Sequence, residues 1–166
     1  MIKDHSVDLI TVAQAMHWFK LDDFYQEIQR VAKPNALFSA WCYTLIEISP
    51  EIDPLIHHLY DNILGDAYWP KERRYIDTAY ETIPFPFERI KTLVFTIERK
   101  LNLFQLIGYL NTWSALQEYK AKNNQKNPID FILEDLQKAW GNPEKEYFTS
   151  TPVGLLATRL NHSLIV

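Results

Sequence analysis

The chain has 166 residues, of which 47% are hydrophobic and 14% aromatic; this composition supports a packed core, predicts one domain and excludes a disordered polypeptide. A net charge of −4 without a dense basic patch gives nucleic-acid binding no electrostatic support. The single cysteine, Cys42, cannot form an internal disulfide. Its place inside an apolar run favours a small buried side chain over a nucleophile.

The beginning of the chain predicts a βαβ unit over residues 6–46. The β-branched run at 7–12 is typical of a strand buried on both faces of a parallel sheet. Asp22 is predicted to cap a helix, whose apolar face is formed by Phe24, Ile28 and Val31. Pro34 excludes helical geometry at the residue before it, so the helix ends there and a second apolar strand follows at 36–43. Strands joined in this way are parallel, and their crossover is right-handed.

The remainder of the chain predicts a mixture of helices and two further strands. Residues 49–90 and 102–141 are expected to form helices and loops that cap the strand ends, including one helix from about 103 to 121. The segments 92–101 and 146–160 are expected to be strands that pair antiparallel. All of these elements are predicted to belong to one domain.

No segment of the chain predicts membrane insertion or targeting. The N-terminal apolar run is interrupted by Asp8 and lacks a basic flank. The longest charge-free stretch, residues 101–117, contains Asn, Gln, Thr and Ser side chains and falls short of a membrane span. A cytoplasmic location is therefore expected.

Several motifs occur in a characteristic order along the chain. The most specific ones lie within the predicted βαβ unit, and they are Asp8-Leu9-Ile10, Ala13-Gln14-Ala15-Met16-His17-Trp18-Phe19 and Arg30-Val31-Ala32-Lys33-Pro34. Weaker ones follow, namely Trp69-Pro70 with Arg73 and Arg74, Ile83-Pro84-Phe85-Pro86-Phe87, and Tyr109-Leu110 with Thr112-Trp113-Ser114. Together they resemble class I S-adenosylmethionine-dependent methyltransferases, most closely the type 11 branch that includes trans-aconitate-methyltransferase-like proteins.

The cofactor fingerprint of that family is a strand followed by a Gly-x-Gly-type turn, with an acidic residue about 20 positions further on. The four glycines here are Gly65, Gly108, Gly141 and Gly154, and none lies within two residues of another. Asn35 stands where the family usually has glycine after Lys-Pro, although Asn tolerates left-handed geometry. The resemblance therefore implies an α/β fold that corresponds to the C-terminal portion of the family domain: an incomplete Rossmann-like sheet with an inserted helical cap.

The resemblance also implies a site at the loop that follows the first strand, because ligands of open α/β sheets bind outside the carboxyl ends of the strands. Ala13, Gln14 and Trp18 are expected to line S-adenosylmethionine, and His17 is the candidate catalytic residue. The alternative is that Trp18 packs the following helix while His17 is half-exposed.

An acceptor pocket is expected to be lined by aromatic and basic side chains, and the candidates are Trp41, Tyr43, Arg73, Tyr109 and Trp113. Each also has a structural interpretation, as core packing for the aromatic residues or as a solvated helix face for Arg73. The pair His57-His58 does not predict a metal site, since neighbouring helical residues point about 100° apart.

Two classes of function are compatible with these features. The first is the acceptor-side part of a methyltransferase acting on a small molecule, inactive alone and binding S-adenosylmethionine weakly or not at all. The second is a non-catalytic remnant that acts as a binding or interaction module. In either case the strand at 7–12 is expected to have an open edge, which favours self-association or pairing with a complementing N-terminal half. No nucleic-acid or membrane partner is expected.

Overall fold

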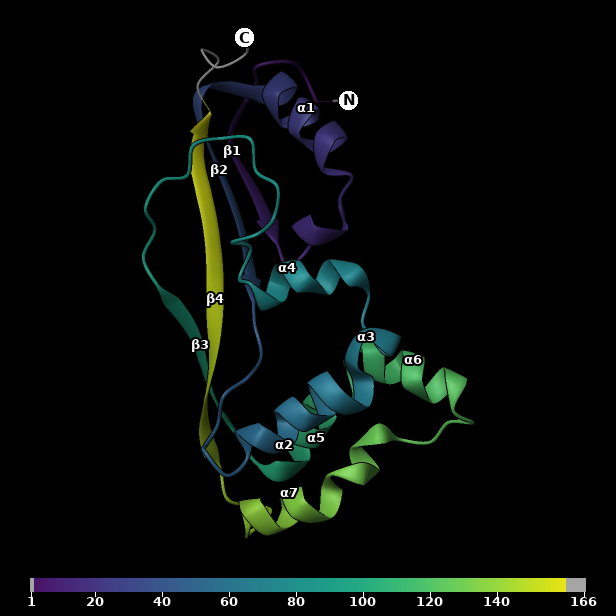
Figure 1. Ribbon diagram of the computed structural model, residues 1–166. Helices are drawn as coiled ribbons and strands as arrows, with labels where there is room; N and C mark the ends of the chain where they lie inside the picture. The colour runs from purple at the N-terminus through teal and green to yellow at the C-terminus, as the bar shows by residue number, and fades with distance from the viewer. Residues whose placement is uncertain (1, 161–166) are drawn as a thin grey trace. The chain divides into compact units, whose positions relative to one another are not determined.

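The computed structural model describes residues 2–160 and has an α/β fold, as the sequence predicts (Figure 1). A mixed four-stranded sheet has the order β1-β2-β4-β3. The chain divides into two compact units. Among the described residues, the first unit contains 2–45, 72–96 and 152–160, and the second contains 46–71 and 97–151.

The predicted βαβ unit is confirmed in the first unit. Strand β1 (Val7–Ala13), helix α1 (Leu21–Val31) and strand β2 (Ala32–Tyr43) follow one another, and the two strands pair in parallel from Leu9 opposite Leu37 to Ala13 opposite Trp41. The helix begins earlier than expected, so the prediction that Asp22 is the N-cap was wrong: Lys20 is the N-cap, and Asp22 lies in the first turn. A carboxylate there still stabilises the helix, because it faces the positive end of the helix dipole.

Strand β4 (Tyr147–Leu160) has two neighbours in the sheet. It pairs antiparallel with β2, from Ala36 opposite Leu160 to Tyr43 opposite Val153, which the sequence did not predict. Its other neighbour is β3 (Phe95–Leu101), close to the expected partner 92–101.

The approach to β3 also lies along β4. The amide of Ile90 donates to the Ala157 carbonyl and Thr92 Oγ1 donates to the Leu155 carbonyl. Later residues on one segment therefore meet earlier residues on the other, as in an antiparallel arrangement.

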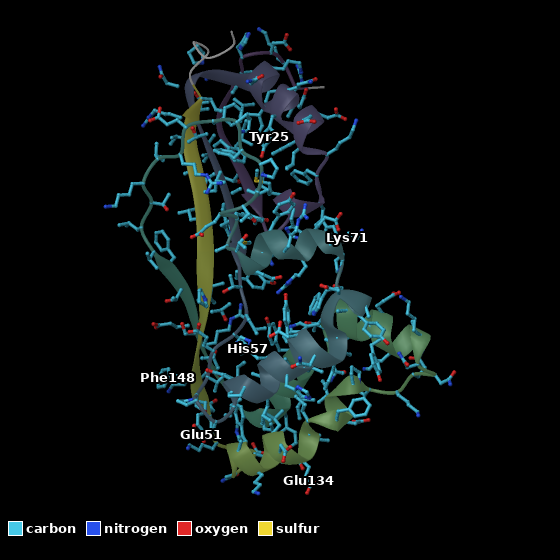
Figure 2. The ribbon with its side chains drawn as sticks, in the orientation of Figure 1. Tyr25, Glu51, His57, Lys71, Glu134 and Phe148 are labelled. Carbon is cyan, nitrogen blue, oxygen red and sulfur yellow. The ribbon has the colours of Figure 1, made fainter. Side chains whose placement is uncertain are left out.

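One face of the sheet in the first unit carries the hydrophobic core. Phe38, Ala40 and Cys42 alternate along β2 with half-buried or exposed residues and are themselves fully buried. Helix α1, helix α4 (Arg74–Asp77) and the segment 80–87 cover this face. An aromatic cluster holds the proline-rich segment against α1 and β2, and its members are Phe24, Tyr25, Phe38, Phe85 and Phe87. Figure 2 labels one member of this cluster, Tyr25.

The second unit is mostly helical. Its elements are α2 (Asp53–His57), a π-helix (His58–Leu64), α3 (Gly65–Tyr68), α5 (Leu103–Leu110), α6 (Ser114–Lys122), a 3₁₀ helix (Pro128–Phe131) and α7 (Leu133–Trp140). Its core contains fully buried aliphatic side chains and one tryptophan, among them Ile52, Ile56, Leu59, Leu106, Leu110, Leu116, Leu136 and Trp140. A further short 3₁₀ helix, Lys71–Arg73, lies where the chain passes between the units.

The single helix expected from about 103 to 121 is interrupted, so that prediction was wrong in one respect. Helices α5 and α6 are separated by residues 111–113. The Thr112 hydroxyl donates to the Tyr109 carbonyl over 2.7 Å, and Trp113 has an extended backbone. A threonine side chain that satisfies a backbone carbonyl in this way competes with continued helix.

Among residues 2–160, no helix is both long and apolar enough to cross a lipid bilayer.

Candidate functional site

The loop after β1 is built by hydrogen bonds to the end of β2. Gln14 has a left-handed backbone with φ of 51°, and its amide donates to the Trp41 carbonyl over 2.8 Å. Its side-chain Oε1 accepts from the Tyr43 amide over 2.8 Å. The chain then enters a single 3₁₀ turn, Met16–Trp18. The two strand ends are thereby tied together where the loop begins, which fixes the loop's direction.

His17 is buried in this turn, with 5% of its surface exposed. Its Nδ1 lies 2.9 Å from the phenolic oxygen of Tyr80, and its ring lies 4.8 Å from the indole of Trp18 between centroids. Burial lowers the pKa of His17 below the ordinary histidine value, and the nearby Arg73 adds to this effect while Glu72 opposes it. The imidazole is therefore neutral at physiological pH.

Tyr80 was not among the residues that the sequence predicts. Its side chain is fully buried, and burial raises its pKa to about 12, so the phenol keeps its proton. It lies 63 positions from His17 and follows α4 in a turn where its φ is 65°. A buried tyrosine in left-handed geometry has no local sequence signal, because bulky residues seldom adopt that conformation.

Cys42 lies in the same core, with no exposed surface. Burial raises the pKa of its thiol to about 12, so the reactive thiolate is not formed near neutral pH. This agrees with the prediction of a small buried side chain rather than a nucleophile.

The remaining predicted site residues fall into three places. Arg73 lies in the first unit, near enough for its charge to lower the pKa of His17, and its Nε is 3.5 Å from Asp77 Oδ1. Trp41 and Tyr43 alternate with Cys42 along β2 and so lie on the opposite face of the strand.

Tyr109 and Trp113 belong to the second unit. There Trp113 contacts three aromatic rings at centroid distances of 5.7 to 6.1 Å, those of Tyr60, Trp69 and Tyr109. The acceptor-binding roles of all five residues stay predictions.

The residues predicted to line the cofactor differ in how much surface they leave available. Ala13 is exposed and small, and Trp18 leaves 57% of its surface exposed, so an aromatic face is available to an adenine ring or a sulfonium. The side-chain oxygen of Gln14, by contrast, is already bound by the Tyr43 amide. Gln14 therefore shapes the loop, and the cofactor-lining roles of Ala13, Gln14 and Trp18 stay predictions.

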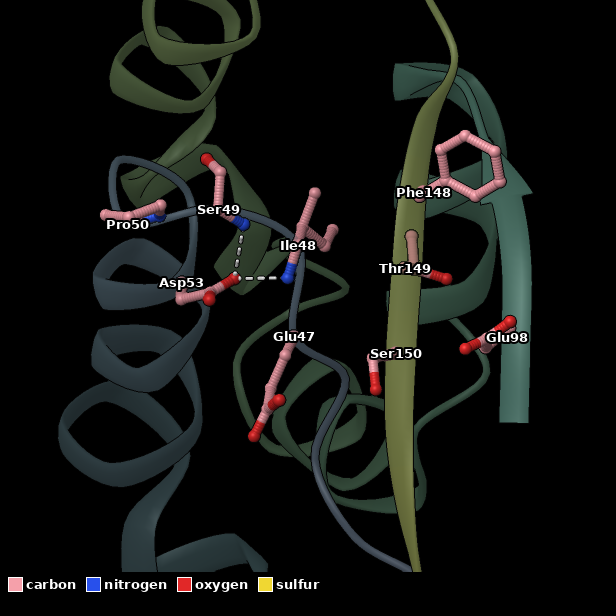
Figure 3. Close-up of a pocket in the computed structure, with 9 residues that line it drawn as sticks. All are labelled: Glu47, Ile48, Ser49, Pro50, Asp53, Glu98, Phe148, Thr149 and Ser150. Carbon is pink, nitrogen blue, oxygen red and sulfur yellow. Dashed lines mark hydrogen bonds between the residues drawn. The ribbon is translucent and has the colours of Figure 1, made fainter. Parts of the chain in front are cut away.

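A separate cavity of about 500 Å³ lies in the second unit (Figure 3). Glu47, Asp53 and their neighbours line one side, and Glu98 with residues 148–150 line the other. The carboxylate of Asp53 accepts hydrogen bonds from the amides of Ile48 and Ser49 over 2.7 and 3.2 Å. The lining residues that the structure describes include none of the predicted site residues. Within residues 2–160, no group of three or more His, Cys, Asp or Glu side chains is arranged to hold a metal ion.

A parallel βαβ unit with a structured loop at the carboxyl end of its first strand is the ligand-binding arrangement of open α/β sheets. Comparison with known proteins defines it further. Residues 1–40 match the family model described as a methyltransferase domain. A solved structure from Anaeromyxobacter dehalogenans, assigned as a type II methyltransferase, is 38% identical with a TM-score of 0.86, covering 97% of this chain and 68% of its own. The chain belongs to the class I S-adenosylmethionine-dependent methyltransferases.

Curated relatives agree with this membership. A protein of Dictyostelium discoideum assigned as a methyltransferase is 38% identical, covering 81% of this chain and 52% of its own length. A methyltransferase-like protein of Schizosaccharomyces pombe is 27% identical, covering 82% of this chain and 51% of its own. This chain thus spans about half the length of the curated relatives that it matches.

Proposed function

We propose that this chain is the acceptor-side part of a methyltransferase that moves a methyl group from S-adenosylmethionine to a small-molecule acceptor. The observation that carries the proposal is the loop 13–19, which leaves the carboxyl end of β1 and buries His17 between Trp18 and Tyr80. When bound, the cofactor supplies a methyl group already activated on a sulfonium, so protein residues chiefly orient the acceptor and exclude water. The buried imidazole of His17 and its aromatic neighbours suit that task.

Tight binding of the cofactor in this family needs a glycine-rich turn that this chain does not contain. Its four glycines are isolated from one another, and none can form the Gly-x-Gly-type turn of the family. We therefore propose that the chain alone is inactive in methyl transfer, and that its activity needs further methyltransferase sequence in the same or another polypeptide.

Isothermal titration calorimetry of the isolated chain with S-adenosylmethionine tests this proposal. The expected result is no measurable heat of binding at micromolar cofactor, because one exposed indole and one small residue are too few contacts for tight binding. S-adenosylhomocysteine serves as the control ligand, since it lacks the sulfonium charge. A micromolar dissociation constant for either compound would show that the chain holds a complete cofactor site.

The alternative function is a non-catalytic interaction module. The hydrogen bond from the Tyr43 amide to the Gln14 side chain favours it. In this bond the side-chain oxygen of a residue expected to line the cofactor holds the loop to β2 instead. Methyl transfer in a reconstituted enzyme that is lost with His17→Ala would argue against this alternative.

The edge of the sheet at β1 suggests where additional sequence attaches. Among the described residues, β1 has one hydrogen-bonded neighbour in the sheet, and Leu9 leaves 56% of its surface exposed. An open edge with exposed apolar side chains pairs readily with another strand. We propose that its partner is a strand of the cofactor-binding portion of a methyltransferase.

Light scattering tests whether β1 binds the cofactor-binding portion of a methyltransferase. The probe is the part of the Anaeromyxobacter dehalogenans relative that this chain does not match. We expect a one-to-one complex with the chain, lost when Leu9→Lys places a charge on the edge strand. Phe104→Lys, at an exposed position of α5, is the control and should leave the complex intact. A homodimer of the chain that excludes the probe would contradict this partner and support self-association.

A further inference from the structure

The hydrogen bonding of Tyr80 defines a direction for its contact with His17. Tyr80 is fully buried, and the hydrogen-bond partner that the structure gives its hydroxyl is the imidazole Nδ1 of His17. A phenol oxygen has two lone pairs and one hydrogen. Nδ1 lies 2.9 Å away, and a buried hydroxyl hydrogen without an acceptor costs more free energy than an unused lone pair, so the phenol donates and Nδ1 accepts.

Tyr80 is held in place by an unusual turn. Ala79 and Tyr80 are consecutive residues with φ of 50° and 65°, a conformation that costs on the order of 1 kcal/mol or more per non-glycine residue. Two backbone hydrogen bonds stabilise the turn: the amide of Ala79 donates to the Ile76 carbonyl over 2.8 Å, and the amide of Tyr80 donates to the Tyr75 carbonyl over 2.7 Å. The guanidinium of Arg89 donates to the Tyr80 carbonyl over 3.2 Å.

Gly154 of β4 fixes the position of this turn against the sheet. A Cβ atom at Gly154 would lie 2.4 Å from the Ala79 carbonyl oxygen and 2.7 Å from its Cα. Any side chain at 154 would therefore displace the backbone that carries Tyr80. Strained backbone of this kind persists only where the contacts of the surrounding structure hold it in place.

We infer that Tyr80 is a positioning residue that holds His17 as the neutral tautomer protonated on Nε2. The imidazole then presents a hydrogen-bond donor to its surroundings rather than a free basic nitrogen. This gives the candidate catalytic residue His17 a specific role, as a group that orients an acceptor atom by donating a hydrogen bond to it. The inference rests on the proposed function only for that role, because the tautomer itself is a property of the chain.

Two-dimensional ¹H–¹⁵N NMR of the imidazole side chains tests the inference without cofactor or acceptor. In the unmodified chain we expect the His17 signals of the Nε2–H tautomer, with Nδ1 as the unprotonated nitrogen. In Tyr80→Phe we expect a mixture of tautomers and a His17 pKa closer to 6.5, since the donor that favours neutral Nδ1 is gone. The charges acting on His17, Arg73 and Glu72, are unchanged in this variant.

The sign of the pH dependence follows from the lowered pKa. The neutral imidazole contributes stability that is present above pH 6.5 and is lost as the pH falls through the lower folded-state pKa. In Tyr80→Phe, the loss of folding stability on acidification should be smaller.

Tyr25→Phe is the control, because it removes another buried phenol hydroxyl of the first unit, one bonded to the Pro84 carbonyl. It should leave the His17 tautomer unchanged. An Nδ1–H tautomer in the unmodified chain would overturn the inference even if Tyr80→Phe does not fold. Unaltered His17 signals in a folded Tyr80→Phe would overturn it as well. Absence of methyl transfer in any assay bears on the proposed function alone.

Discussion

Gly154→Ala is expected to lower the free energy of unfolding by about 3 kcal/mol, because the new methyl group meets backbone atoms of Ala79 that cannot rotate away. The turn at Ala79 and Tyr80 must shift as a unit, and Tyr80 then withdraws from His17. Urea unfolding followed by circular dichroism measures the first effect. The imidazole NMR signals of His17 measure the second.

Gly108→Ala provides a matched control for this substitution. Gly108 lies within α5, and no atom comes within 4 Å of a Cβ built there. Replacing a helical glycine by alanine stabilises a helix by up to about 1 kcal/mol. If Gly154→Ala and Gly108→Ala have equal effects on stability, the close approach of β4 to the turn does not exist in solution.

Phe38→Ala is expected to have the largest effect on stability, a loss of about 4 kcal/mol, because it empties the centre of the aromatic cluster. The ring is fully buried and lies 5.8 Å from Phe85 and 6.1 Å from Phe24 between centroids. Its removal should also release the proline-rich segment 84–87, which that cluster holds against β2. Thermal unfolding measures the loss, and amide hydrogen exchange at residues 85–90 reports the release.

Phe104→Ala serves as the comparison for Phe38→Ala. Phe104 leaves 60% of its surface exposed, so its removal should change stability by no more than about 0.5 kcal/mol. A loss at Phe104 as large as that at Phe38 would mean that Phe104 is covered in solution.

Local patterns predicted the βαβ unit well because each of its elements has its own periodicity. The β-branched run at 7–12, the apolar face of 24–31 and the strand at 36–43 all occur within a few residues of their expected bounds. The helix start was misplaced at Asp22 because a carboxylate suits both the N-cap and the first turn. The pairing of β2 with β4 was missed, since it joins segments that no local pattern relates.

The candidate site was predicted only in the part that is continuous in sequence. The loop 13–19 follows a strand, and the sequence therefore placed His17 and Trp18 at a strand end. Tyr80, which forms a hydrogen bond with His17, comes from a turn 63 positions later, and Gly154, which makes room for that turn, comes from β4. A lone glycine within a strand has several explanations, and only the fold shows that Gly154 makes room for Ala79.

The position of β4 in the chain affects the order in which the molecule can form. The first unit consists of three stretches separated by 46–71 and 97–151, and Tyr43 pairs with Val153 across more than a hundred residues. During synthesis from the N-terminus, β2 therefore emerges long before the strand that covers its second edge. Pairings of such long range are slow, and an unpaired β2 edge is prone to mispairing in the interval. We expect the nascent chain to need protection from mispairing over that interval. The second unit has most of its residues in the single stretch 97–151, so we expect it to fold first.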